Sequence, residues 1–183
     1  MTLPVHVVAV PDAAETTDGA PDETLQYLAA YLALLDEIVG DSADNEEMLA
    51  RLRATPEGVA GALELVTTGI PAAFRPEKAE GETGRVLFVI DTDTEQIRLC
   101  FEFLPDRCEA VPITDEFATT VRIGVADFLK IAFKYLDGND AYLNGLTEVT
   151  GDVFIATNLD QWFDRPSTDM ADMISSMTAD SGF

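Results

Sequence analysis

Few side chains in this sequence have the type and spacing that catalysis requires. His6 is the only histidine, and an imidazole that acts as a general base needs an orienting partner and a pocket. The chain has 34 acidic residues, so pairs of carboxylates arise by chance, and no pair stands out for acid and base catalysis. The sequence has no Gly-X-Ser-X-Gly elbow, phosphate-binding glycine loop or dinucleotide fingerprint. We therefore predict that the protein is not an enzyme, and we assign no catalytic residue.

Two short motifs have features of a metal or thiol site. Asp91-Thr-Asp-Thr-Glu95 has the alternating acids of a calcium loop, but the glycine and the distant glutamate of such a loop are missing, which favours a solvated hairpin turn. Cys100 and Cys108 flank a turn at Pro105 and could face each other across a hairpin. We expect two reduced, half-buried thiols, because two cysteines make no disulfide framework and no second Cys or His pair exists for zinc. We predict no metal site and no cofactor.

Large apolar side chains recur instead on segments that are expected to face each other. Composition alone assigns them to a hydrophobic core. This apolar set comprises Phe88, Ile90, Leu99, Phe101, Phe128, Ile131, Ala132, Tyr135, Tyr142, Leu143, Phe154 and Trp162.

The elements that position this set begin with a predicted hairpin. The runs 85–90 and 96–103 flank the turn at 91–95, and apolar residues alternate along the second run, so one face looks inward. A third short strand, 107–111, follows, and a fourth begins at Thr119.

A helix is predicted directly after the fourth strand, because Phe128, Ile131, Ala132 and Tyr135 stand at i, i+3, i+4 and i+7. A short turn at 141–144 and a fifth strand at 146–150 come next. Asp152 is the expected N-cap of a last amphipathic helix. The prediction is an α+β fold with about five mostly antiparallel strands, covered on one face by helices.

Three further helices are expected before the sheet. The first runs from its expected N-cap, Asp22, to Gly40, and most of its circumference is apolar, so it is either buried in its own domain or a dimer face. A second helix is expected near 45–53. A third begins at Thr55-Pro56, where proline takes the first helical position, and ends at 69–71.

The order of motifs after Thr119 is informative. Strand and helix lead to Gly138 and then to Ala141-Tyr-Leu-Asn-Gly145, which is followed six residues later by Gly151-Asp152. This segment resembles the sterol carrier protein type 2 family, in which an Ala-aromatic-X-X-Gly box precedes Gly-Asp or Gly-Asn at this spacing. Upstream, residues 69–79 are similar to the helix-to-sheet approach of bacterial members. The chain thus looks like a stand-alone bacterial or archaeal member.

The chain departs from the family mainly in its turns. Asp91 to Glu95 and Pro105-Asp106 stand where many bacterial members have a Gly-Gly-X-Trp turn and an Asp-Gly turn, and Leu146 stands where a lysine often follows the box. These changes alter turns and the tunnel rim more than the frame, so they leave the identity of the ligand open.

The resemblance implies a non-catalytic protein that binds or transfers a lipid, as an acyl or isoprenoid chain, in an apolar tunnel between sheet and helices. It makes the apolar set a tunnel lining, with Tyr135, Tyr142 and Trp162 supplying polar tips near the entrance. Such binding gains about 25 cal/mol per Å² of apolar area buried, so affinity should follow chain length more than head group. The alternative is an interaction or dimerisation module without lipid, which would use the first helix or the C-terminal tail.

Charge limits the partners of the protein. The formal net charge of −23 opposes binding to nucleic acid and to anionic membranes. No apolar run approaches the ~18 residues that cross a bilayer, so we expect a cytoplasmic protein, as monomer or homodimer. Transient membrane contact stays open, because the acidity could reflect a halophilic source, and at about 1 M salt the Debye length is only about 3 Å.

The chain divides into three parts. Residues 1–21 are predicted to be an apolar arm and a flexible acidic linker, residues 22–166 a single domain in which the family resemblance covers 69–163, and residues 167–183 a methionine-rich tail. The tail either covers a gap in the core or acts as a lid over the tunnel mouth. The helical spacing of the tail is set by Met170, Met173, Ile174 and Met177.

Overall fold

A five-stranded mixed sheet is the centre of the computed structural model, which describes residues 21–166. The predicted N-terminal arm and methionine-rich tail lie outside the described residues. The strand order is β3-β2-β1-β4-β5, with β1 parallel to β4 and every other pair antiparallel. The strands are β1 Gly84–Asp91, β2 Gln96–Phe103, β3 Cys108–Val111, β4 Thr119–Gly124 and β5 Thr147–Gly151. The predicted α+β class, with a mostly antiparallel five-stranded sheet, is confirmed.

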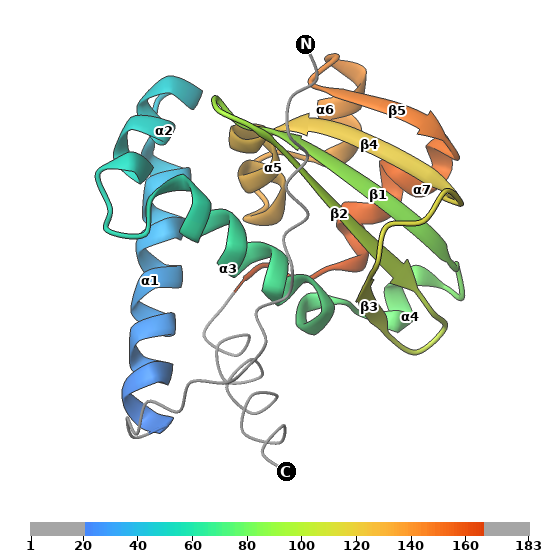
Figure 1. Cartoon of the computed structure of the whole chain (residues 1–183), viewed down its shortest axis with the longest axis horizontal. Helices are drawn as coiled ribbons and strands as arrows, with labels where there is room; N and C mark the ends of the chain where they lie inside the picture. The colour runs from blue at the N-terminus through green and yellow to red at the C-terminus, as the bar shows by residue number, and fades with distance from the viewer. Residues whose placement is uncertain (1–20, 167–183) are drawn as a thin grey trace.

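Helices pack against one face of this sheet. Figure 1 shows α3 and α5 beside the sheet, with α1 and α2 beyond them, and α1 and α2 both contact α5. The helices are α1 Pro21–Asp41, α2 Asn45–Arg53, α3 Gly58–Ala73, α4 Pro76–Ala79, α5 Val125–Ala132, α6 Gly138–Leu143 and α7 Val153–Asn158, and a 3₁₀ turn, η1, spans Leu159–Trp162.

Two helix ends differ from their predictions. Helix α3 begins at Gly58, and the Thr55 hydroxyl accepts a hydrogen bond from the Gly58 N–H at 3.1 Å, so Thr55 closes the preceding turn. The helix then continues past Pro71 to Ala73. Pro71 has no N–H to donate, so the last turn of α3 has one backbone hydrogen bond fewer than a regular helix. The Arg75 guanidinium also donates to the Ala72 carbonyl at 3.1 Å.

The predicted N-cap at Asp152 is confirmed. Its carboxylate accepts hydrogen bonds from the N–H groups of Phe154 at 2.9 Å and Ile155 at 3.2 Å. Gly151 precedes it with φ +98°, and a Cβ there would lie 2.4 Å from the Ala118 carbonyl oxygen. Only glycine fits this turn, which directs the chain from β5 into α7.

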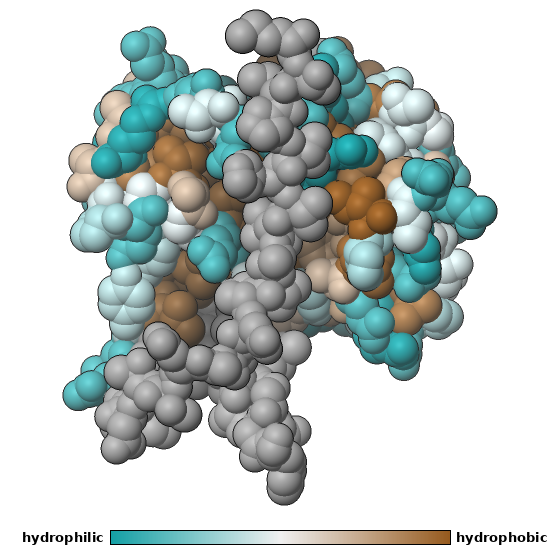
Figure 2. All heavy atoms as spheres, viewed as in Figure 1, coloured by the Kyte–Doolittle hydropathy of each residue, from teal (hydrophilic) through white to brown (hydrophobic). Residues whose placement is uncertain are grey.

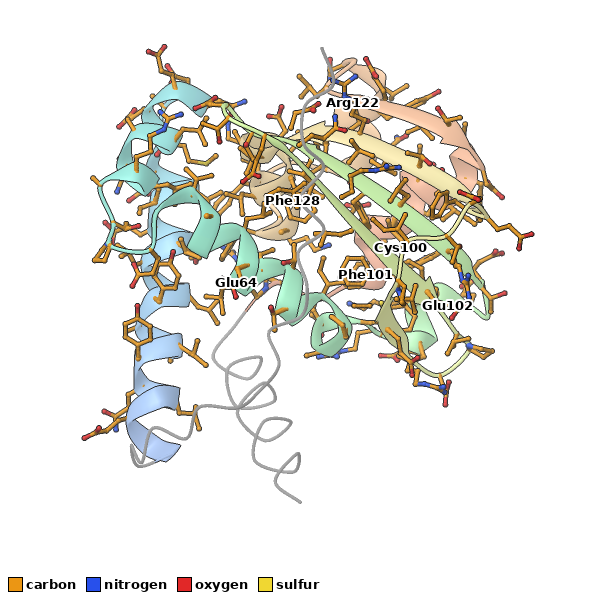
Figure 3. All side chains as sticks on the ribbon, viewed as in Figure 1. Glu64, Cys100, Phe101, Glu102, Arg122 and Phe128 are labelled. Carbon is orange, nitrogen blue, oxygen red and sulfur yellow. The ribbon has the colours of Figure 1, made fainter. Side chains whose placement is uncertain are left out.

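The main core lies between the sheet and the helices. Phe88 packs edge-on against Phe101 and Phe128, each at 6.0 Å between ring centroids. Figure 3 labels these two partners, Phe101 on β2 and Phe128 on α5. Helix α1 contributes one buried stripe that includes Leu35 and Ile38, while Tyr27 on the same helix is 54% exposed. Much of the apolar surface of α1 is therefore buried within its own domain.

The opposite face of the sheet carries a smaller apolar cluster of Leu87, Val89 and Cys100. Cys108 instead belongs to the main core, where it pairs with Phe103 across β2 and β3. The two cysteines therefore do not face each other, which the sequence had left as a possibility, because alternate residues of β2 point to opposite faces of the sheet. Both thiols are free and buried.

We expect both thiols to be unreactive in the folded protein. Burial raises the pKa of Cys100, and it raises the pKa of Cys108 to about 12, so the nucleophilic thiolate is scarce at pH 8. Titration with a chromogenic disulfide reagent should detect no rapid reaction in native buffer and two thiols per chain in urea. A fast reaction of either cysteine in native buffer would contradict this account of their burial.

Candidate functional site

A largely apolar cavity lies between the sheet and the helices. Its lining comes from α3, β1, β4, α5, α6, β5 and α7, together with the segment 159–166. The space open to the centre of a water molecule is about 100 Å³, and a single water needs only ~10–15 Å³ by this measure. The cavity is therefore larger than an ordinary packing defect. The strand and α3 residues that line it are Phe88, Val121, Ile123, Thr147, Val149, Val66, Gly69, Ile70 and Ala73.

Small residues on the covering helices explain why the space is not filled. Gly69 and Ala73 stand one turn apart on α3, Ala132 ends α5, and Ala156 lies on α7, and all four line the cavity. Residues at i and i+4 share a helix face, so α3 presents a short strip with little side-chain volume. Larger apolar side chains at these positions would close the gap between helices and sheet.

Five residues of the predicted apolar set line this cavity. Phe88 comes from β1, Phe128, Ile131 and Ala132 come from α5, and Tyr142 comes from α6. The helical spacing after the fourth strand thus places one face of α5 on the cavity.

Four other members of the set belong to the main core or its edge and do not line the cavity. Ile90 and Phe101 are 0% and 2% exposed, and Phe101 packs edge-on against Phe88. Leu99 is half-buried at the edge of the main core. Trp162 is buried with its ring 5.5 Å from that of Phe103, so it fills the core beside the cavity.

The remaining three members are on the surface, and their assignment to the lining is corrected. Leu143 and Phe154 are 71% and 60% exposed, because the inward positions of the short helices α6 and α7 are taken by Ala141 and Ile155. Tyr135 is 47% exposed, and its hydroxyl donates to Asp36 at 3.0 Å.

The sequence did not point to the charged residues of the cavity, which are Lys134, Asp160 and Asp164. The Lys134 ammonium donates to the backbone carbonyl of Asp160. The Asp160 carboxylate accepts from the Gly138 N–H at 3.2 Å, while its Oδ1 is buried without a hydrogen-bond partner among the described residues. These side chains come from segments far apart in sequence, so no local spacing could have identified them.

Burial and neighbouring charges set the ionisation of this polar group. Burial raises the pKa of the Asp160 carboxyl, and partial desolvation of the Lys134 ammonium lowers its pKa although the residue as a whole is exposed. Asp164 accepts hydrogen bonds from Lys78 at 2.6 Å and lies 2.6 Å from Arg75, and the Lys78 hydrogen bond is the largest cause that lowers its pKa. Lys134 is exposed, so the polar group marks the place where the cavity reaches the surface.

The charged groups of the cavity are held by backbone groups or by cations outside the lining. Among these described residues no nucleophile lies beside a base. In residues 21–166, no group of three or more His, Cys, Asp or Glu side chains could hold a metal ion. No helix in this range is long and apolar enough to cross a membrane. On the face shown in Figure 2, hydrophilic side chains predominate around the outline of the described surface.

Comparisons with known proteins were made for sequence and for structure. No protein-family model matches the sequence, and no curated protein matches it. Sterol carrier protein 2 like 2 from Aedes aegypti is similar in structure, with 24% identity, a TM-score of 0.48, and coverage of 56% of this chain and 97% of that chain. A palmitated form of the same carrier has 23% identity, a TM-score of 0.40, and coverage of 47% and 77%.

An inverting sec-alkylsulfatase from Pseudomonas sp. is also similar, with 14% identity and a TM-score of 0.47. The match covers 82% of this chain and 31% of the sulfatase. All three TM-scores are below 0.5, so we take no function from these structures.

Proposed function

We propose that this protein binds one lipid-like molecule, with an acyl or isoprenoid chain in the cavity, and that it acts as a carrier without catalysing a reaction. The observation that carries the proposal is the apolar cavity between the sheet and helices α3, α5, α6 and α7. A hollow of this kind is unfavourable unless something fills it, because the lining atoms lose dispersion contacts and the site is too apolar to hold water well.

Binding in such a site would be driven by removal of apolar surface from water. The gain is about 25 cal/mol per Å², or about 0.8 kcal/mol for each methylene that is buried. Few polar groups line the interior, so the wall discriminates poorly between chains of equal length. The protein should therefore accept a class of long apolar molecules.

A second candidate function is protein contact, which the exposed apolar residues of α6 and α7 favour. Leu143, Leu146, Val153 and Phe154 are 41–71% exposed, and α6 contacts α7. Exposed apolar residues gathered in this way often mark an interaction surface. A partner on this surface is compatible with a filled or an empty cavity, so ligand binding separates the two functions.

A chain-length series tests the carrier function. We expect affinity for unbranched primary alcohols from octanol to tetradecanol to rise about fourfold per methylene, which corresponds to about 0.8 kcal/mol. Isothermal titration calorimetry, or fluorescence of Trp162 beside the cavity, would measure it. Affinity that does not change with chain length, or no binding of any member, would contradict the proposal and leave protein contact as the better candidate.

A further inference from the structure

We infer that Lys134 determines the specificity of the cavity, and that the polar end of its ligand is an anion, a carboxylate or a phosphate, held at the cavity mouth. The inference rests on the proposed function and narrows the class of ligand. Three features of Lys134 support the inference: its position, the lack of a carboxylate partner among the described residues, and its backbone conformation.

Lys134 stands where an apolar chain in the cavity would meet solvent. The residue lines the cavity and is nevertheless exposed. Its ammonium donates to the carbonyl oxygen of Asp160, another lining residue. An ammonium has three donors and no acceptor, so two donors remain for a ligand. A head group beside Lys134 leaves the chain free to enter the cavity, which Phe128 and Ala156 help to line.

Lys134 is unusual among the cations because no carboxylate of the described residues pairs with it. Eight of the eleven lysines and arginines lie within 4.0 Å of a carboxylate. The other three are Arg98, Lys130 and Lys134, and only Lys134 lines the cavity. In a chain of net charge −23, a cation that has no carboxylate partner within residues 21–166 and stands at the mouth of an apolar cavity is a ready site for an anion.

The surrounding charges leave room for one added anion. Asp164 is matched by Lys78 and Arg75. Burial raises the pKa of Asp160, which reduces the repulsion that its carboxylate would exert on an anion, and Asp137 is occupied as the N-cap of α6. Desolvation lowers the pKa of Lys134, so a bound anion would stabilise a charge that the site now leaves partly uncompensated.

The backbone at Lys134 supports a role beyond helix termination. The residue follows the C-cap Phe133 of α5 and has φ +62°, a conformation that glycine adopts at the lowest cost. A lysine near a helix C-terminus is favoured by the helix dipole. The ammonium, however, reaches across to Asp160 instead of the last carbonyls of α5, which places it on the cavity.

Lys134→Met tests the inference, because methionine keeps the length of the side chain and removes its charge. The matched control is Lys130→Met, which lies in the last turn of α5, shortly before Lys134, but outside the cavity lining. Three ligands with the same chain would be compared by calorimetry at pH 7: tetradecanoate, tetradecyl phosphate and tetradecanol. Circular dichroism and thermal melting would show that both variants fold.

We expect the wild type to bind at least one anion about tenfold more tightly than the alcohol, as suits a charge-assisted contact. Lys134→Met should lose about tenfold in anion affinity and change alcohol affinity by less than about threefold, while Lys130→Met changes neither. The tighter of the two anions identifies the head group.

Three results would overturn the inference. In the first, the alcohol binds as tightly as both anions; in the second, Lys134→Met lowers the affinity for all three ligands equally. Either result means that Lys134 does not distinguish between head groups, while the carrier function stands. If none of the three binds, the carrier function and the inference fall together.

Discussion

Replacement of Phe103 by alanine is expected to lower the free energy of unfolding by about 3–5 kcal/mol, the range for a fully buried phenylalanine. Phe103 is 1% exposed, and its ring lies 5.5 Å from Trp162, 5.6 Å from Phe74 and 5.9 Å from Phe163. These partners come from the end of α3 and the segment around η1, so the ring joins the sheet to the elements beside the cavity. Urea titration followed by circular dichroism would measure the change.

The matched control for Phe103→Ala is Phe154→Ala. The Phe154 ring is 60% exposed, and surface substitutions away from special features usually change stability by less than about 0.5 kcal/mol. Similar losses for the two variants would mean that Phe103 does not hold the core together as its contacts indicate. A loss of stability in Phe154→Ala alone would mean that contacts of α6 and α7, and not those of Phe103, stabilise the fold.

Replacement of Ala132 by phenylalanine is expected to reduce affinity for apolar ligands by at least about tenfold. The new ring would occupy space now open between α5 and the sheet, because Ala132 lines the cavity one turn after Phe128. Displacement of about two methylenes from the site is enough for this loss, since each is worth about 0.8 kcal/mol. Calorimetry with tetradecanol would measure the affinities of the variant and of the wild type.

Ala50→Phe is the control for Ala132→Phe, because Ala50 is exposed on α2 and far from the cavity lining. It should bind tetradecanol as the wild type does. Unchanged binding by Ala132→Phe, with cooperative unfolding retained, would show that the ligand is held elsewhere. Equal losses in both variants would indicate a general effect of added apolar surface.

The frame of the fold could be predicted from local patterns. Alternating apolar residues such as Phe101 and Phe103 identified β2, the spacing from Phe128 to Ala132 identified α5, and Asp152 identified the start of α7. These signals are local, because period and capping depend on residues within a few positions of one another. The pairing of β1 with β4 in parallel needed the whole sheet and was not foreseen.

The cavity could be predicted only in part, because it exists where the covering helices carry small residues in place of large side chains. A search for large apolar residues finds Phe88 and Tyr142, but it also selects Phe101, which fills core, and Leu143, which faces solvent. Gly69 and the alanines of the lining carry no such signal, since small residues are common throughout helices. Their effect appears only when α3 and α7 are placed over the sheet.

The polar mouth was beyond sequence reasoning for another reason. Lys134 and Asp160 are 26 residues apart and meet because α6, β5 and α7 return the chain to the end of α5. Among 34 acidic residues, nothing distinguishes Asp160 before its burial is known. Its raised pKa and the unpaired Lys134 are properties of the folded chain.

The central claim is that one apolar molecule occupies the hollow between helices and sheet. Native mass spectrometry of the protein purified from its own host, under conditions that keep non-covalent complexes, weighs that molecule directly. We predict one added mass per chain, in the range of a single-chain lipid, and its absence from the Ala132→Phe variant prepared in the same way. A bare chain mass for the wild type, unchanged after incubation with tetradecanol or tetradecanoate, would contradict the claim.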